Sequence, residues 1–385
     1  MNFKIQAKGI FFVSISQFGM ALSFSFVMTF LPFYIAKISP YGQKETIIWT
    51  GLIIGPSHIL TALAAPFWGS LTSRFRPKLL FERGMLSNGL LFLIMGFVNH
   101  LPLLLILRMI QGALGGVSTI GLILISSLSK EDRLHKDFSF FQNSITAGQL
   151  VGPLLGAYTA SVFGYRTAFI FAFFIATIFL IFCHQHVEEV PIQKRKTFAE
   201  TNLKKSLIWA WLLSFTATIH LTFLISILPT LLGNFQLTDN VALKSAGFII
   251  ISYTITAIIG NYVLSHIALK FGLMRIITMA CILGSIFQFL LSISPNIVSF
   301  TVFRMLQTGF IASIFPLTLS TFGRDIGGRT VGFMNSSRFV GMAVGPIIAT
   351  TVMAYSNLLI LSLIIAGLTF ASLWGFIVSL SWKER

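Results

Sequence analysis

Long apolar stretches separated by short polar segments run along almost the whole chain. They lack the period of two that marks the strands of a membrane barrel, so they predict helices. A bilayer core about 30 Å thick takes about 20 apolar residues per helix, and the stretches suffice for twelve spans. The spans are expected at residues 10–35, 49–71, 79–98, 101–128, 138–163, 167–183, 207–232, 244–268, 273–293, 297–320, 331–354 and 358–379.

Prolines are expected to shape the first two spans, because proline removes a backbone donor from a helix. Pro32 lies close to the end of the first span, and Gly55-Pro56 and Pro66 predict two breaks within the second. The longest polar segment, residues 184–206, carries lysines, glutamates and one proline. It predicts a flexible cytoplasmic connector between two halves of the chain.

The two halves share landmarks at one spacing. Arg108 and Arg304, each followed by a glutamine three residues later, lie 196 residues apart, and Pro153 and Pro346 lie 193 apart. A fixed spacing near half the chain length indicates a duplicated unit. Because each half holds an even number of spans, the copies run parallel. The predicted fold is an all-α membrane protein of two pseudo-symmetric six-helix bundles, with boundaries at 1–183, 184–206 (connector) and 207–385.

Composition supports the membrane assignment and removes one alternative. The chain is 55% hydrophobic and 10% charged, whereas soluble domains carry about 25% charged residues. The net charge of +16 would suit a nucleic-acid partner. However, most of the 27 lysines and arginines fall in segments on one side of the predicted spans, as the positive-inside rule requires. We therefore expect a multi-pass protein of the plasma (inner) membrane with both termini cytoplasmic and no nucleic-acid partner.

Two arginines within apolar spans are the strongest candidates for function. Arg108 shares a helix face with Gln111 and Gly112, and Arg304 shares one with Gln307. A charged residue at membrane depth faces the bundle interior or a cavity rather than lipid. Two interpretations stay open: each arginine ties down neighbouring carbonyls, or it handles substrate or protons directly.

The positions of the acidic residues bear on the charge of any small molecule that the protein binds. None of the 11 aspartates and glutamates lies at the centre of a span, so Arg108, Arg304 and Arg338 have no obvious acidic partner. A central cavity lined by these groups would be positive unless glutamine, tyrosine and backbone groups neutralise it. The sequence therefore favours an anionic, zwitterionic or neutral small molecule over a simple cation.

A stripe of small residues marks the fifth span. Gly148, Gly152 and Gly156 recur every four residues with Pro153 between them, and Gly345 with Pro346 repeats part of this pattern in the second half. Such stripes let helices approach closely, and proline adds a bend.

These motifs together resemble the major facilitator superfamily, and within it the twelve-span drug:proton antiporter branch. The resemblance covers nearly the whole chain. It rests on Arg108, Gln111 and Gly112 in the fourth span, and on the glycines with Pro153 in the fifth. The family's basic loop signature is matched by Gly69, Arg74 and Lys78, whereas Ser73 stands at its acidic position.

The resemblance implies alternating access around a cavity formed by spans one, four, seven and ten, with no cofactor and no metal. The candidate cavity residues are Phe24, Met28, His58, His220, Phe223 and Arg338, together with Gln111 and Gln307. Relatives often couple protons through a carboxylate in the first span, and this chain has none there. His58 and His220 are the candidate substitutes, and the alternative is that each is a hydrogen-bonded packing residue.

The expected function is export of small organic molecules by proton-coupled antiport, by a monomer whose partners are the lipid bilayer, the cargo and protons. The alternative is a dedicated exporter of an anionic metabolite such as a carboxylate siderophore. A membrane-embedded enzyme is disfavoured, because the spans hold no nucleophile with its base, paired carboxylates or metal cluster.

Overall fold

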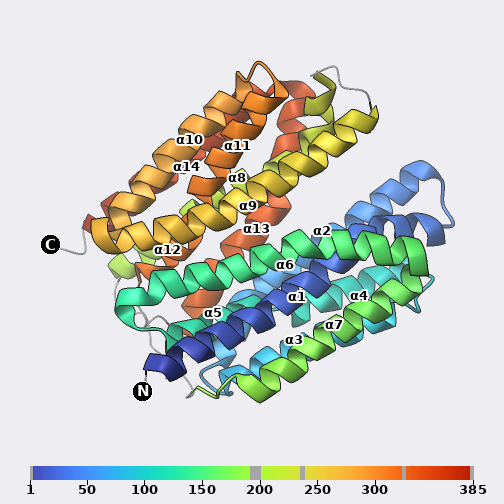
Figure 1. The fold of residues 1–385 in the computed structure, drawn as a ribbon, viewed down its shortest axis with the longest axis horizontal. Coiled ribbons are helices and arrows are strands. Elements are labelled where there is room, and N and C mark those ends of the chain that lie inside the picture. Colours follow the sequence, from blue (N-terminus) through green and yellow to red (C-terminus); the bar gives the residue numbers. More distant parts are fainter. Residues whose placement is uncertain (1–2, 191–200, 235–238, 323–326, 382–385) are drawn as a thin grey trace. The chain divides into compact units, whose positions relative to one another are not determined.

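The computed structural model describes residues 3–190, 201–234, 239–322 and 327–381. Within these ranges the regular structure is helical, which confirms the predicted all-α class. Residues 191–200, which make up part of the predicted connector, lie outside the described residues. Figure 1 shows the helices in chain order.

The chain divides into two compact units. The described residues of unit 1 lie within Met1–Lys196 and Arg324–Ser336, and those of unit 2 lie within Thr197–Gly323 and Ser337–Arg385. The helices of unit 1 are α1 (Phe3–Ile38), α2 (Gln43–Leu71), α3 (Pro77–Met95), α4 (Leu101–Leu114), α5 (Val117–Leu128), the 3-10 turn η1 (Glu131–Arg133), α6 (Leu134–Phe163) and α7 (Tyr165–His186). Those of unit 2 are α8 (Thr201–Asn234), α9 (Asp239–Phe271), α10 (Leu273–Ser292), α11 (Ile297–Ile311), α12 (Ile314–Ser320) and α14 (Leu358–Ser381).

Helix α13 (Gly328–Tyr355) belongs to both units, because the boundary falls between Ser336 and Ser337. The start of the helix packs within unit 1, where Gly332 approaches the backbone of Ala65 in α2 so closely that a side chain would not fit. The predicted domain boundaries do not anticipate this division, and they stay a prediction.

The same helix pairs pack within each unit. In unit 1, α1 packs against α7, α3 against α7 and α2 against α4. In unit 2, α8 packs against α14, α10 against α14 and α9 against α11. Adding seven to each helix number of a pair in unit 1 gives the corresponding pair in unit 2. Two copies of one bundle are expected to show this correspondence.

Both predicted helix interruptions are absent, whereas one that the sequence analysis did not predict is present. Helix α2 runs without a break through Pro56 and Pro66, so the predicted breaks there are wrong. Neighbouring helices in a bundle commonly compensate the lost backbone bond of such a proline. Likewise α1 continues past Pro32 to its end at Ile38. The fourth span, by contrast, is interrupted at Gly115 and Gly116, between α4 and α5.

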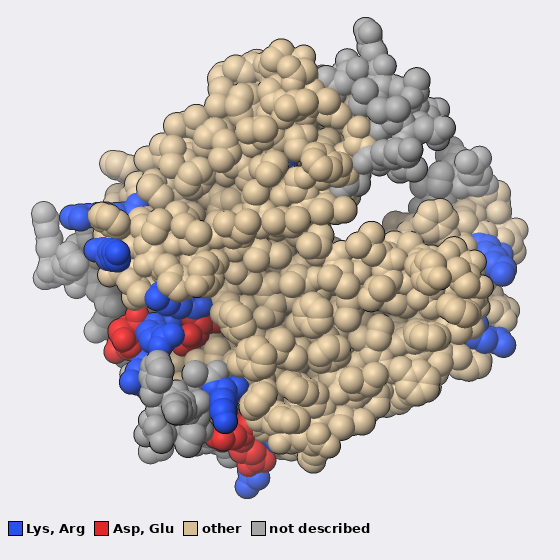
Figure 2. Space-filling model, in the orientation of Figure 1, with Lys and Arg blue, Asp and Glu red and all other residues tan. Residues whose placement is uncertain are grey.

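Ten helical segments in the described part of the chain are long and apolar enough to cross a membrane. The predicted spans 79–98 and 138–163 fall on α3 and α6, which are not among the ten. Charged residues such as Glu82 and Arg83 in α3, and polar residues such as Gln142 and Gln149 in α6, lower their hydropathy. The outward-facing side chains of the bundles are largely apolar, among them Leu63 (71% exposed) and Trp374 (72%). On the face shown in Figure 2 most of the surface carries no charged side chain.

Candidate functional site

Arg108 is fully buried in unit 1 and joins α4 to α2. Its Nη2 donates to Ser57 Oγ over 2.8 Å, and its Nε donates to the Ile53 carbonyl over 3.4 Å. Its Nη1 donates to Gln111 Oε1, one turn further along α4. The guanidinium carbon lies 5.4 Å from the centre of the Phe24 ring of α1, within range of a cation–π interaction.

Arg304 holds the corresponding place in unit 2 and is also fully buried. Its Nη1 donates to Gln307 Oε1 and to the His220 carbonyl, each over 2.7 Å. Its Nη2 donates to the Leu221 carbonyl over 3.0 Å. The guanidinium carbon lies 5.0 Å from the centre of the Phe223 ring, as Arg108 lies over Phe24. Both arginines thus combine a glutamine one turn away, a carbonyl of a neighbouring helix and a phenylalanine face.

These contacts explain how a permanent charge is kept inside each bundle. Neither Arg108 nor Arg304 forms an ion pair with a described residue. Instead, neutral oxygens accept from most of the N–H groups, which lowers the desolvation cost of a buried charge, while Arg304 Nε is buried without a partner among the described residues. Gly112 lets α2 come close enough to reach Arg108, because a Cβ at Gly112 would lie 3.0 Å from Ser57 Cα. The predicted alternative in which the arginines tie down carbonyls therefore has a geometric basis in both units.

His220 lies in a buried polar network that crosses four helices of unit 2. Gln307 Nε2 donates to His220 Nδ1 over 2.9 Å and to Gln288 Oε1 over 3.1 Å. His220 Nδ1 also lies 3.3 Å from Gln288 Oε1, and its Nε2 lies 2.9 Å from Thr369 Oγ1. Gln288 Nε2 in turn donates to Ser362 Oγ over 3.2 Å. Both ring nitrogens are engaged, so the imidazole acts here as a packing and hydrogen-bonding group.

His58 differs from His220 in having a ring nitrogen left over. Its Nδ1 lies 3.3 Å from the Ile54 carbonyl one turn back in α2, and its Nε2 has no partner among the described residues. The side chain is partly exposed. Its ring meets the Phe24 ring edge to face, with centres 6.2 Å apart. Phe24 therefore contacts both His58 and Arg108, and these three predicted site residues come together in unit 1.

Two further predicted cavity residues lie elsewhere in their units. Met28 is partly buried and packs against the apolar core formed by α1, α3, α4 and α7. Arg338 is buried in α13, and its guanidinium carbon lies 4.9 Å from the centre of the Phe315 ring of α12.

The predicted glycine stripe of α6 faces α1 (Figure 1). A Cβ added at Gly148 would lie 2.6 Å from the Phe18 carbonyl oxygen, and one at Gly152 would lie 2.8 Å from that of Leu22. Gly156 meets the α1 backbone in the same way. These glycines allow backbone-to-backbone packing of the two helices.

The second copy of the stripe packs α13 on α8 within unit 2. A Cβ added at Gly341 would lie 2.6 Å from Thr218 Cβ, and one at Gly345 would lie 2.5 Å from a threonine hydroxyl of α8. Pro346 lies inside α13 as Pro153 lies inside α6, and both helices continue through their prolines.

The basic loop between α2 and α3 begins at a tight crossing. Gly69 and Gly328, the first residue of α13, meet backbone to backbone with no room for a side chain at either. Ser73, at the position where the family signature has an acid, donates from Oγ to the Ser70 carbonyl over 2.8 Å. Arg74 is exposed. Ser73 thus closes a local turn within the loop.

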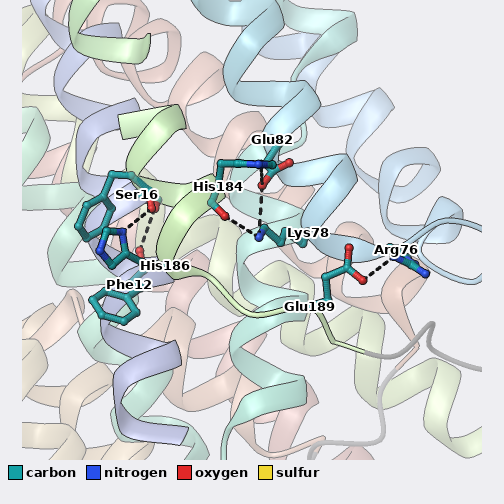
Figure 3. Close-up of polar contacts among 9 residues, drawn as sticks. Phe12, Ser16, Arg76, Lys78, Glu82, His184, His186 and Glu189 are labelled. Carbon is teal, nitrogen blue, oxygen red and sulfur yellow. Dashed lines mark hydrogen bonds and ion pairs between the residues drawn. The ribbon is translucent and has the colours of Figure 1, made fainter. Parts of the chain in front are cut away.

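Lys78 and the residues around it tie the start of α3 to the end of α7 (Figure 3). Lys78 Nζ donates to the His184 carbonyl over 2.8 Å and lies 3.7 Å from Glu82 Oε1, which is 3.3 Å from His184 Nδ1. Arg76 and Glu189 form a separate, exposed ion pair of 2.7 Å. These contacts all lie at one end of unit 1.

Asp137 lies in the first turn of α6, just before the predicted fifth span. Burial raises the pKa of this carboxyl, against the effect of a hydrogen bond from Ser129 and the positive charge of Arg133. A carboxylate in the first turn also interacts favourably with the helix dipole.

Sequence reasoning missed a second arginine site in unit 1. Arg83 was not among the predicted site residues, yet it lies in the second turn of α3 with its guanidinium carbon 3.5 Å from the centre of the Trp68 ring. It contacts the interruption at Gly115 and Gly116. A glycine pair inside an apolar span was the available signal for this interruption.

Two bundles built on one plan, each with a buried arginine and glutamine on its fourth span, define a multi-pass membrane transporter. The chain belongs to the Major Facilitator Superfamily, whose sequence profile matches residues 13–346. It is therefore a transporter rather than an enzyme.

Relatives and solved structures agree with this assignment. The chain is 26% identical over 361 residues to a Klebsiella pneumoniae protein named multidrug resistance protein MdtG, covering 90% of this chain and 87% of the relative. The human organic anion transporter MFSD10 (TETRAN) superposes with a TM-score of 0.81 at 15% identity, covering 96% of this chain and 99% of that one. The E. coli fucose:proton symporter FucP superposes with a TM-score of 0.73 at 15% identity, covering 96% and 98%. The two structures share the fold.

Proposed function

We propose that this transporter exports small organic molecules by alternating access, coupled to proton entry. The observation that carries the proposal is the repeated pair of buried arginines, Arg108 and Arg304, each with its glutamine and its phenylalanine face. Equivalent polar groups in both repeats are expected where each repeat of a transporter handles its substrate. The name of the relatives, multidrug resistance protein, supports export of several compounds rather than one.

The expected cargo is anionic, zwitterionic or neutral. Arg108 and Arg304 are permanent charges, and no described acidic residue pairs with either. A carboxylate on the cargo would gain charge-assisted hydrogen bonds from such groups. The same observation favours a second candidate, a dedicated exporter of an anionic metabolite such as a carboxylate siderophore. MFSD10 is described as an organic anion transporter, which supports an anionic substrate under both candidate functions.

His58 is the proposed proton carrier. An imidazole titrates near neutrality, and only one nitrogen of His58 is engaged, whereas both nitrogens of His220 lie within a buried network. Arg108 and His58 both contact the Phe24 ring. A change in the contacts of Arg108 would therefore alter the proton affinity of His58.

We further propose that the transporter works as a monomer in the plasma (inner) membrane with both termini in the cytoplasm. The excess of lysine and arginine in the segments assigned to the inner side supports this orientation.

The experiment is uptake into proteoliposomes that hold the full-length protein, with an imposed pH gradient. Three fluorescent probes of different charge are compared: carboxyfluorescein (anionic), ciprofloxacin (zwitterionic) and ethidium (cationic). We expect the anion or the zwitterion to accumulate against its gradient only when protons flow the opposite way. Uptake of ethidium alone, or rates that ignore the pH gradient, would overturn the proposed cargo or the proposed coupling respectively.

A further inference from the structure

The interruption between α4 and α5 is held open by two side chains from other helices. Trp68 Nε1 of α2 donates to the Ala113 carbonyl over 2.8 Å, and Arg83 Nη2 of α3 donates to the Gly115 carbonyl over 3.2 Å. In an unbroken helix these carbonyls would accept from the amides of residues 117 and 119. Trp68 and Arg83 thus replace two backbone bonds that the interruption removes.

The backbone of the interruption is fixed by the same pair. Gly116 has φ of 91°, a left-handed conformation that favours glycine, and a Cβ there would lie 2.8 Å from the Trp68 ring. The Arg83 guanidinium stacks on that ring, with its carbon 3.5 Å from the ring centre. One aromatic ring therefore lies between the turn and the cation.

Helices α4 and α5, the two parts of the interrupted span, have different main packing partners. Helix α4, which bears Arg108, packs mainly against α2 and less against α3, while α5 packs mainly against α1, α3 and α6 and less against α2. At the start of α5, Ser118 Oγ and Thr119 Oγ1 each accept from Asn335 Nδ2 of α13 over 3.0 Å. Helix α13 also contacts α2, where Gly332 meets the backbone of Ala65 and Gly328 meets that of Gly69, so it contacts both α5 and the helix that α4 packs against.

Arg83 is only partly satisfied in this arrangement. Its Nε and Nη1 are buried and have no hydrogen-bond partner among the described residues. Buried unpaired donors are rare in native structures because each forgoes its bonds to water. If Arg83 left the Gly115 carbonyl for a position where all its N–H groups have acceptors, the free-energy cost of the two unpaired donors would disappear. The bond between Arg83 and Gly115 can therefore break at a low cost.

We propose that Gly115 and Gly116 form a hinge, and that Arg83 of α3 is a positioning residue that holds the Arg108-bearing pair α2–α4 against the rest of unit 1, through the Gly115 carbonyl and the Trp68 ring of α2. During transport Arg83 leaves the Gly115 carbonyl, and α2 and α4 turn together about the hinge. The inference rests on the chain being a transporter, and it needs neither the proposed cargo nor proton coupling.

The test measures distances between spin labels by pulsed electron resonance in the full-length protein in nanodiscs, with Cys183 and Cys281 replaced by serine. One label pair, at Ile106 of α4 and Leu90 of α3, reports across the hinge. A second pair, at Ile106 and Leu63 of α2, lies within the proposed moving pair. All three sites are exposed on their helices.

We expect Arg83→Gln to add a second distance, or to move the mean distance, for the α3–α4 pair and to leave the α2–α4 pair unchanged. Arg83→Lys, which keeps the charge and one donor, should give an intermediate distribution. Trp68→Phe loses the bond to Ala113, which lies within the α2–α4 pair, so this variant should change the α2–α4 distance, as Arg83→Gln should not.

Arg166 offers a matched control. Its Nε donates to the Gly96 carbonyl over 3.4 Å, at the end of α3, and its guanidinium lies over the Phe97 ring. This is the same type of contact at a terminus that no helix follows directly, so Arg166→Gln should change neither distance. Unchanged α3–α4 distances in folded Arg83→Gln would overturn the hinge, as would equal changes in both label pairs of that variant. Proteoliposome uptake tests the proposed function separately, so the two can fail independently.

Discussion

Arg108 Nη2 lies 2.8 Å from Ser57 Oγ, and this bond joins the fourth span to the second. Replacing Ser57 by alanine leaves a buried charged donor without its acceptor. We expect a loss of about 1–3 kcal/mol in stability. Thermal unfolding in nanodiscs, followed by tryptophan fluorescence, measures it. Thr50→Ala is the control, because this hydroxyl of α2 bonds only the Thr46 carbonyl of its own helix. Equal melting of the two variants would contradict the prediction.

Replacing His58 and replacing His220 should affect the pH dependence of uptake differently. His58→Gln is expected to flatten the dependence of uptake rate on pH between about 6 and 8, since glutamine keeps a donor but does not titrate. His220→Gln removes one link of a buried network, so it should lower the unfolding temperature and leave the shape of the pH profile intact. Rates in proteoliposomes across this range provide the measurement. A profile flattened by His220→Gln instead would reverse the assignment.

Glycines of these helices should tolerate alanine very differently. At Gly152 a Cβ would lie 2.8 Å from the Leu22 carbonyl oxygen and 2.9 Å from the Phe26 amide, so α1 and α6 must separate. Overpacking of this kind costs about 1–3 kcal/mol. At Gly367 of α14 nothing lies within 4 Å of the added carbon. Gly367→Ala should therefore be neutral or slightly stabilising, because alanine favours helix more than glycine. Melting temperatures of the two variants in the same lipid test this contrast.

The ion pairs of Figure 3 should contribute unequally. The Arg76 and Glu189 side chains are 63% and 50% exposed, and exposed pairs contribute at most about 1 kcal/mol before screening by salt. Glu82 is 15% exposed and contacts both Lys78 and His184. We expect Glu82→Gln to lower the unfolding temperature more than Glu189→Gln. Melting at low and high salt should show that only the small effect of Glu189→Gln disappears in high salt.

Much of the fold follows from the sequence, because membrane spans and a repeat leave strong patterns. The spacing between Arg108 and Arg304 correctly indicated two equivalent buried sites, each with its glutamine one turn away. The prolines of the second span were misleading. Pro56 and Pro66 predict breaks by their missing donors, yet α2 continues through both, since packing within a bundle compensates for single lost bonds.

The side-chain contacts between spans could not be predicted from the sequence. Arg83 lies close to the end of a span, where basic residues are common, so the sequence does not distinguish it from a loop residue. Its pairing with Trp68 depends on how α2 and α3 pack. The network around His220 depends likewise on Gln288 and Thr369, which come from α10 and α14. Single polar residues in apolar spans signal a buried partner but not which one.

Because α13 is divided between two units, a fragment that ends in the connector does not contain a whole unit. A polypeptide that ends at Lys196 lacks the segment from Gly328 to Ser336 that completes its own packing against α2 and α5. Produced alone, such a fragment should expose the glycine surface around Gly69 and be degraded readily. Supplying the remaining residues as a second polypeptide should restore it, so that the separated pieces reassemble through one shared helix.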